Sequence, residues 1–114
     1  MKEENVQAAM GIILSAGDAR LFCKAALDAI AVYDMDLAKE KMKEAHAKIT
    51  EAHKIQTDAI QEETRGAESE YTLLFAHAQD TLMTVYSEIN IAKQMIKIFE
   101  AWEVRFQKLE NREK

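Results

Sequence analysis

Apolar residues recur every three or four positions over most of the chain, which is the period of an α-helix packed against a core. The clearest stripe lies in the last third of the chain and comprises Phe75, Ala78, Leu82, Val85, Ile89, Ala92, Ile96 and Phe99. A second stripe comprises Ala38, Met42, Ala45, Ile49, Ala52 and Ala59. Between positions 12 and 27 the apolar residues occupy more than one face, which indicates that the first helix is the most buried.

Breaks in this pattern divide the chain into three helices, at about residues 4–32, 35–63 and 69–109. Asp34 is predicted to cap the second helix, because an aspartate carboxylate accepts a backbone N–H of the first turn. Gly66 is predicted to end that helix in the left-handed conformation. At about 1.5 Å per residue the third helix should be roughly 60 Å long, so its C-terminal end should project or pack against another subunit.

Composition restricts the fold to the all-α class. The chain has 114 residues, no proline and three glycines, and it contains no long alternation of β-branched residues. A length of this order is one domain. The heptad spacing of the third helix adds coiled-coil-like packing. We therefore expect one domain over residues 1–114, folded as an antiparallel three-helix bundle.

Charge and cysteine content exclude several classes of function. The net charge is −5 and the basic residues are scattered among acids, which argues against a nucleic-acid partner. The one cysteine, Cys23, cannot form an internal disulfide, so a cytoplasmic location fits best. The first five residues do not resemble a secretory signal, and no run of about 18 apolar residues predicts a membrane span.

A second face of the third helix leaves two interpretations open. Leu73, Ala76, Asp80, Met83 and Ser87 lie opposite the main stripe, where charged side chains would be usual. Such a face indicates burial between subunits, whereas scattered apolar residues are also common on ordinary surfaces.

Three histidines are the first candidates for chemistry. His46 and His53 share a face of the second helix but lie seven residues apart, so they lack the spacing of a zinc pair. No histidine follows a glutamate by three residues, which argues against a di-iron bundle. We expect His46 to be solvated and His53 to be partly buried and hydrogen-bonded to a neighbour.

His77 has different surroundings from the other two histidines. It precedes Ala78 of the main stripe, with Leu73 and Leu74 one turn before it and Asp80 one turn after it. An imidazole at the edge of an apolar wall should be partly desolvated, which favours its neutral, nucleophilic form. Spacing alone leaves both a structural and a chemical role open for this histidine.

Three stretches resemble one known family. The sequence around this histidine is Phe75-Ala76-His77-Ala78-Gln79-Asp80-Thr81-Leu82-Met83-Thr84. It resembles the active-site stretch of the lactose/cellobiose-type IIA components of the bacterial phosphoenolpyruvate-dependent sugar phosphotransferase system. Residues 11–20 and 51–60 are similar to two further patterns of that family, in the same order and spacing. The resemblance covers about residues 5 to 99.

The resemblance implies an architecture, a reaction and partners. It implies a nine-helix homotrimer in which Asp80 meets its symmetry mates around a divalent cation, usually Mg²⁺. It also implies that His77 accepts a phosphoryl group from the carrier protein HPr and passes it to a cysteine of a IIB component. The membrane IIC component would then phosphorylate a β-linked disaccharide, such as cellobiose or lactose, during transport.

Candidate supporting residues follow from proximity to the histidine. The Gln79 amide and the hydroxyls of Thr81 or Thr84 are candidate donors to the phosphoryl oxygens. Thr81 stands where the family commonly has a second histidine. Residues 101–114 extend beyond the family core, and their role is open.

Two other classes of protein remain as alternatives. A helical adaptor or regulator could keep the phosphorylatable histidine without serving transport, and a purely structural bundle would not be phosphorylated at all. The sequence does not indicate which sugar is carried, since this component does not contact the sugar.

Overall fold

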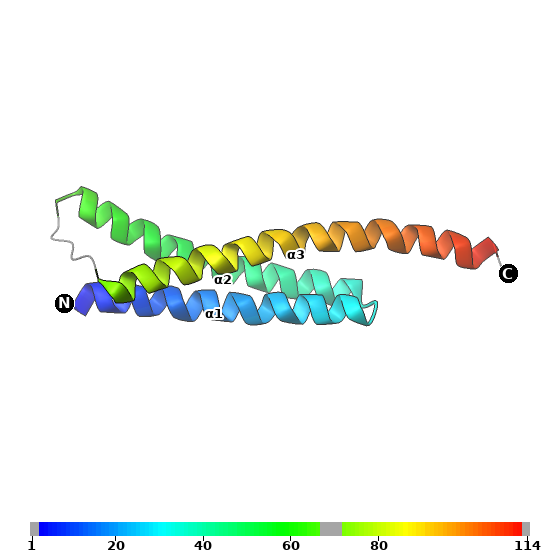
Figure 1. Cartoon of the computed structure of the whole chain (residues 1–114), viewed down its shortest axis with the longest axis horizontal. Coiled ribbons are helices and arrows are strands. Elements are labelled where there is room, and N and C mark those ends of the chain that lie inside the picture. The colour runs from blue at the N-terminus through cyan, green and yellow to red at the C-terminus, as the bar shows by residue number, and fades with distance from the viewer. Residues whose placement is uncertain (1–2, 67–71, 113–114) are drawn as a thin grey trace.

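The chain forms three antiparallel helices (Figure 1). The computed structural model describes residues 3–66 and 72–112. In chain order, α1 comprises Glu3–Ala31, α2 comprises Met35–Thr64 and α3 comprises Leu73–Arg112. The predicted class is confirmed, and the bounds of the first two helices agree with the prediction to within one residue. Ser69, where the third helix was predicted to begin, lies outside the described residues.

The helix ends follow their local sequence. The Leu37 backbone N–H donates to the Asp34 carboxylate at 3.1 Å, which confirms the predicted cap of α2. Gly66 follows α2 with φ of 89° and confirms the predicted left-handed stop. The Thr72 hydroxyl caps α3 by accepting the N–H of Phe75 at 3.1 Å. Tyr33, after α1, has φ of 63°, a conformation in which glycine is usual.

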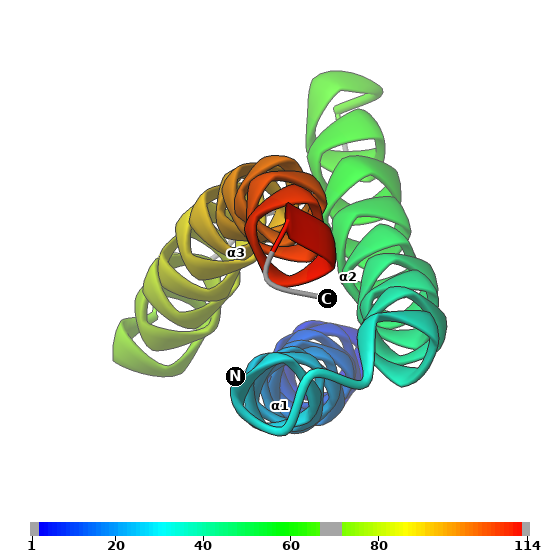
Figure 2. The same cartoon turned by 90° about the vertical axis from the view of Figure 1, so that its right-hand side faces the viewer.

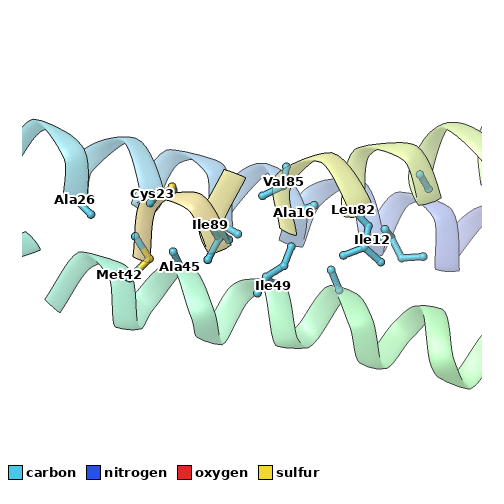
Figure 3. Packing of buried hydrophobic residues seen from close by; sticks show 14 of the residues in the cluster. Ile12, Ala16, Cys23, Ala26, Met42, Ala45, Ile49, Leu82, Val85 and Ile89 are labelled. Atoms are coloured by element: carbon cyan, nitrogen blue, oxygen red, sulfur yellow. The ribbon is translucent and has the colours of Figure 1, made fainter. Parts of the chain in front are cut away.

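The core consists of the predicted stripes, joined along the bundle axis (Figure 3). α1 contributes seven buried residues, α2 five and α3 six, so α1 is the most buried helix as expected. Small residues bring the helices close together, and the side-chain methyl of Ile55 lies 3.1 Å from where a Cβ on Gly11 would be. The largest fully buried side chains are Ile12, Ile49, Leu82, Ile89 and Val85.

Helix α3 is longer than the bundle that it completes. The molecule measures 69 × 20 × 18 Å, and the C-terminal part of α3 projects beyond the α1–α2 turn (Figure 1). Viewed along the long axis, α2 and α3 diverge from each other (Figure 2). The predicted projection is confirmed, and it leaves Trp102, Val104, Phe106 and Leu109 about half exposed.

The apolar composition of α1 bears on the prediction that no segment spans a membrane. By length and hydropathy alone, α1 could cross a membrane. The core helix of a bundle passes the same test, and α1 packs against both other helices. Its apolar character is therefore accounted for in part by the core.

Shortening a core side chain should destabilise the bundle. Leu82 is fully buried, so Leu82→Ala should lower the free energy of unfolding by about 3 kcal/mol through lost apolar burial and a cavity. Leu21 is 67% exposed, and Leu21→Ala is the matched control, with an effect within about 0.5 kcal/mol. Urea unfolding followed by circular dichroism at one protein concentration measures both. Equal losses would contradict this core.

Candidate functional site

His77 lies on the second turn of α3, at the end of the bundle where that helix begins. The next residue, Ala78, is fully buried, whereas His77 is exposed. The expected partial desolvation was therefore wrong for the single chain. Its physical reason is visible one turn back, where Leu73 is itself 85% exposed and offers the imidazole no apolar cover. Within the described residues, the ring of His77 makes no hydrogen bond or ion pair, which leaves it free to react.

Thr81 contacts His77 through the backbone. Its hydroxyl donates a hydrogen bond of 2.9 Å to the carbonyl oxygen of His77. Because this hydroxyl donates its proton to the backbone, it does not donate to a phosphoryl group on the imidazole in this conformation. The role of Thr81 as a donor to the phosphoryl group stays a prediction, and it requires the side chain to rotate.

Replacing this hydroxyl tests what Thr81 does. Thr81→Val keeps the shape of the side chain and removes the donor. If the hydroxyl serves only the helix backbone, the rate of phosphorylation should change less than about threefold, which is below the effect typical of a lost transition-state donor. Rapid-quench measurement of phosphoryl transfer to the variant checks this, and a loss of about a hundredfold would instead make Thr81 a direct donor.

Gln79 lies on a different side of α3 from the imidazole of His77, whereas Asp80, three residues after His77, lies on a neighbouring side of the helix. Residues two apart on a helix point about 200° away from each other, so half-buried Gln79 does not face His77 of its own chain. Asp80 is exposed, and no cation pairs with it among the described residues. Its predicted neighbours Leu73 and Met83 are also largely exposed, at 85% and 51%. Among the described residues, the face that carries Asp80 therefore has no partner within the single chain.

A long groove continues this face toward the C-terminus. It has a volume of about 1080 Å³ and runs beside α3, with one wall from α2. Its lining combines apolar, amide and basic side chains, among them Met42, Lys43, Met83, Tyr86, Asn90 and Gln94. A groove of this size with exposed apolar side chains, next to the face that carries Asp80, is suited to contact with another helix.

The other two histidines serve the scaffold. His46 is exposed as predicted, and its Nδ1 accepts from the Lys93 ammonium at 3.0 Å. The ring of His53 packs edge-on against Tyr86, with ring centroids 4.8 Å apart. The predicted hydrogen bond of His53 is not found at Nε2, which is buried without a partner in the described part of the chain.

Cys23 does not compete as an acceptor of phosphoryl groups. Burial in the core, and secondarily the charge of Glu88, raise the pKa of its thiol. A protonated, buried thiol is a poor nucleophile. The prediction that Cys23 is a small core residue is confirmed.

An ion pair between α1 and α3 escaped sequence reasoning. Arg20 donates two hydrogen bonds to the Glu88 carboxylate, at 2.9 and 3.0 Å, and this carboxylate raises the pKa of the Arg20 guanidinium. Arg20 ends one of the three stretches singled out above. Glu88 lies 68 positions later, so no local pattern pairs the two residues. The bidentate pair holds α1 beside the helix that carries His77.

The two other stretches also pack against each other. Ser15, from the stretch on α1, donates to Glu51 on α2 at 3.4 Å, which is a long hydrogen bond. Together with the contact between positions 11 and 55, this places the two stretches side by side. They support α3 and do not approach the reactive ring through any described hydrogen bond.

Comparison with known proteins decides the family. The family described as PTS system, Lactose/Cellobiose specific IIA subunit, matches residues 7–100. The chain belongs to this family of phosphotransferase IIA components. It is 38% identical over 112 residues to the lactose-specific EIIA component of Lacticaseibacillus casei, which covers 98% of this chain and 96% of the relative.

Solved structures of IIA components have the same fold. The cellobiose-specific enzyme IIA of Bacillus anthracis superposes with a TM-score of 0.84 at 36% identity, covering 91% of this chain and 94% of that one. The IIA component in the Escherichia coli IIA(Chitobiose)–HPr complex superposes with a TM-score of 0.75 at 28% identity, covering 90% and 99%. The protein is thus a component of a sugar phosphotransferase system, as its sequence motifs predicted.

The described residues of one chain contain no cluster of metal ligands. Within residues 3–66 and 72–112, no three His, Cys, Asp or Glu side chains come together as metal ligands. Asp80 offers one carboxylate, a hard oxygen donor of the kind that Mg²⁺ prefers. The predicted metal site at Asp80 stays a prediction, and no cluster of described carboxylates accompanies Asp80 within one chain.

Proposed function

We propose that His77 accepts a phosphoryl group from phosphorylated HPr and passes it to a cysteine of a IIB component. The observation that carries this proposal is the exposed imidazole at the start of α3, which has no partner among the described residues and lies inside the stretch that resembles the family's active site. A related IIA component has been solved in complex with HPr, which supports the same donor for this chain.

The chemistry requires little covalent machinery from the protein. A ring nitrogen of neutral His77 attacks the phosphorus; the new N–P bond forms as the N–P bond to the HPr histidine breaks. In the second step a IIB thiolate attacks the same phosphorus; an S–P bond forms as the N–P bond to His77 breaks, and the electron pair of that bond returns to the ring nitrogen of His77. Exchange between two phosphohistidines is nearly balanced in free energy, so presentation of an accessible nitrogen in line with phosphorus is the main task. Exposure of His77 meets that requirement.

The free face of α3 supports assembly as a homotrimer. One continuous surface comprises Asp80, the exposed residues Leu73 and Met83, and the groove beside α3, and no other described segment of the single chain covers it. Three copies around an axis through this face would bury it and bring three carboxylates together. Like charges at close range in a protein interior cost on the order of several kcal/mol unless they are compensated. A bound Mg²⁺ would supply that compensation, with Asp80 of each copy as its ligand.

Names of the relatives indicate the class of sugar. The similar proteins include components specific for lactose, cellobiose and diacetylchitobiose, all of which are β-linked disaccharides. We infer transport of a sugar of this class through a IIC membrane component, with this protein acting in the cytoplasm. The sugar itself would contact the membrane component, so the surface of the IIA chain does not select it.

Reconstitution of phosphate flow tests the proposed function. Purified protein is incubated with enzyme I, HPr and labelled phosphoenolpyruvate, and then with IIB and IIC in vesicles loaded with a candidate disaccharide. Sugar phosphate should accumulate only when the protein is present. Phosphorylation of the protein without transfer to any IIB partner would instead assign it to the adaptor or regulator class.

A further inference from the structure

An aromatic pocket lies at the end of the bundle opposite His77. It has a volume of about 360 Å³ and is lined from the α1–α2 turn on one side and from the projecting part of α3 on the other. Four of the eight aromatic residues of the chain gather here, namely Tyr33, Phe99, Trp102 and Phe106. Trp102 is 25 residues from His77 on the same helix, which corresponds to roughly 37 Å. Occupancy of this pocket leaves His77 accessible.

The walls of the pocket are held in place before any ligand binds. Phe99 packs edge-on against Trp102, with ring centroids 5.9 Å apart and planes at 83°. Tyr33 adopts the left-handed conformation at φ of 63° and is nevertheless 80% exposed. The left-handed conformation destabilises a non-glycine residue by on the order of 1 kcal/mol. The exposed ring of Tyr33 buries too little apolar surface to offset this free energy. The cost is consistent with a binding role for the exposed ring.

Charge around the pocket favours a cation. Glu103 lines the pocket and is half-buried, and no hydrogen bond or ion pair engages its carboxylate in the described residues. The nearby Lys39 ammonium is bound by Glu100 at 3.0 Å, so it does not neutralise Glu103 by direct contact. Aromatic faces attract cations through their quadrupole, and a neighbouring carboxylate adds to this attraction.

A second hollow extends the surface along the helix. It has a volume of about 330 Å³, is lined by Trp102, Arg105, Phe106 and Leu109, and shares two aromatic walls with the first pocket. Two adjoining hollows with exposed apolar walls fit an extended segment better than one compact ligand. The walls from Trp102 onward also lie beyond residue 100, where the match to the common family domain ends.

We propose that this aromatic surface binds a segment of a partner protein in which an arginine or lysine is flanked by apolar residues. The basic side chain enters the pocket between Trp102 and Tyr33 and faces Glu103. The flanking apolar residue packs on Phe106 and Leu109. The surface is a second interaction site, separate from the exchange of phosphoryl groups at His77.

Trp102 is the single tryptophan of the chain, so its fluorescence reports directly on this surface. The full-length protein in its native assembly is titrated with the acetylated and amidated peptide Leu-Arg-Leu. The control is the same peptide with citrulline, a neutral isostere, in place of arginine. We expect a saturable change with the arginine peptide and at least roughly fivefold weaker binding of the citrulline peptide, as expected for a partly exposed charge pair.

Two variants test whether the preference for the arginine peptide depends on Glu103. Glu103→Gln should remove the preference for arginine, whereas Glu110→Gln, which alters a carboxylate outside both pockets, should retain it. Equal binding of the two peptides, or a preference that survives in Glu103→Gln, would overturn the proposal. A Trp102 emission that is already that of a buried indole and does not respond would show that copies of the chain cover the surface. If phosphatidylcholine vesicles change the Trp102 emission equally in the parent protein and in Glu103→Gln, the surface binds lipid. Coverage by other copies of the chain and binding of lipid would each overturn the proposal.

Discussion

His77→Gln should abolish phosphorylation of the protein by phospho-HPr while leaving the three-helix bundle intact. Glutamine keeps a polar side chain at an exposed position, so it removes the ring nitrogen without disturbing the core. Because no other described group offers an accessible nitrogen in the same place, incorporation of label should fall to background, at least about a thousandfold in rate. Loss of an essential nucleophile has effects on this order or larger.

Matched histidine variants make this result specific. His46→Gln changes an exposed histidine on α2 and should be labelled at the rate of the parent protein. The phosphoryl group should be lost in acid and retained in alkali, as expected for an N–P bond. Circular dichroism of all forms should coincide. Undiminished labelling of His77→Gln, or loss of labelling in His46→Gln alone, would contradict the assignment of His77.

Asp80→Leu should remove the dependence of assembly on divalent cations. In the proposed trimer, three convergent carboxylates would repel one another when the metal is withdrawn, at a cost on the order of several kcal/mol. We therefore expect chelation to weaken the parent trimer and added Mg²⁺ to restore it. Leucine removes the charge and adds apolar area to the buried face, so the variant should stay trimeric with or without Mg²⁺. Sedimentation velocity over a range of protein concentrations measures both effects.

A second carboxylate provides the control for this experiment. Asp58 is exposed on α2 at the same end of the bundle, and Asp58→Leu should leave the response to Mg²⁺ unchanged. A parent protein that sediments as a monomer in the presence of Mg²⁺ would contradict the trimer. A trimer whose stability ignores chelation would keep the interface and exclude the metal from Asp80. The result at His77 does not depend on either outcome.

Local sequence predicted the elements of this fold closely. The three- and four-residue spacing of Leu82, Val85 and Ile89 predicts a buried stripe because a helix repeats every 3.6 residues, and these residues are buried. Asp34 and Gly66 predict helix ends because capping and left-handed stops act within one turn. The motif around His77 could also be recognised from local sequence, because its residues follow one another along one helix.

Tertiary structure decided which side chains meet. Arg20 and Glu88 pair across 68 positions because α1 and α3 lie side by side, and nothing near either residue encodes the partner. The exposure of His77 reversed the expectation from its apolar neighbours, since Leu73 is itself 85% exposed and Ala78 is buried in the core. Gln79 likewise follows the histidine in sequence yet projects from another side of the helix.

The aromatic pocket, at the end of the bundle opposite His77, also depends partly on local sequence and partly on tertiary structure. The sequence by itself predicted that the third helix continues beyond residue 100, and Trp102 and Phe106 form a short apolar stripe on it at a spacing of four residues. Only the packing of α3 against the α1–α2 turn placed Tyr33 opposite that stripe and enclosed a pocket with Glu103 at its edge. Helical period and capping are properties of neighbouring residues, whereas cavities and ion pairs depend on distances between helices, which long-range packing sets.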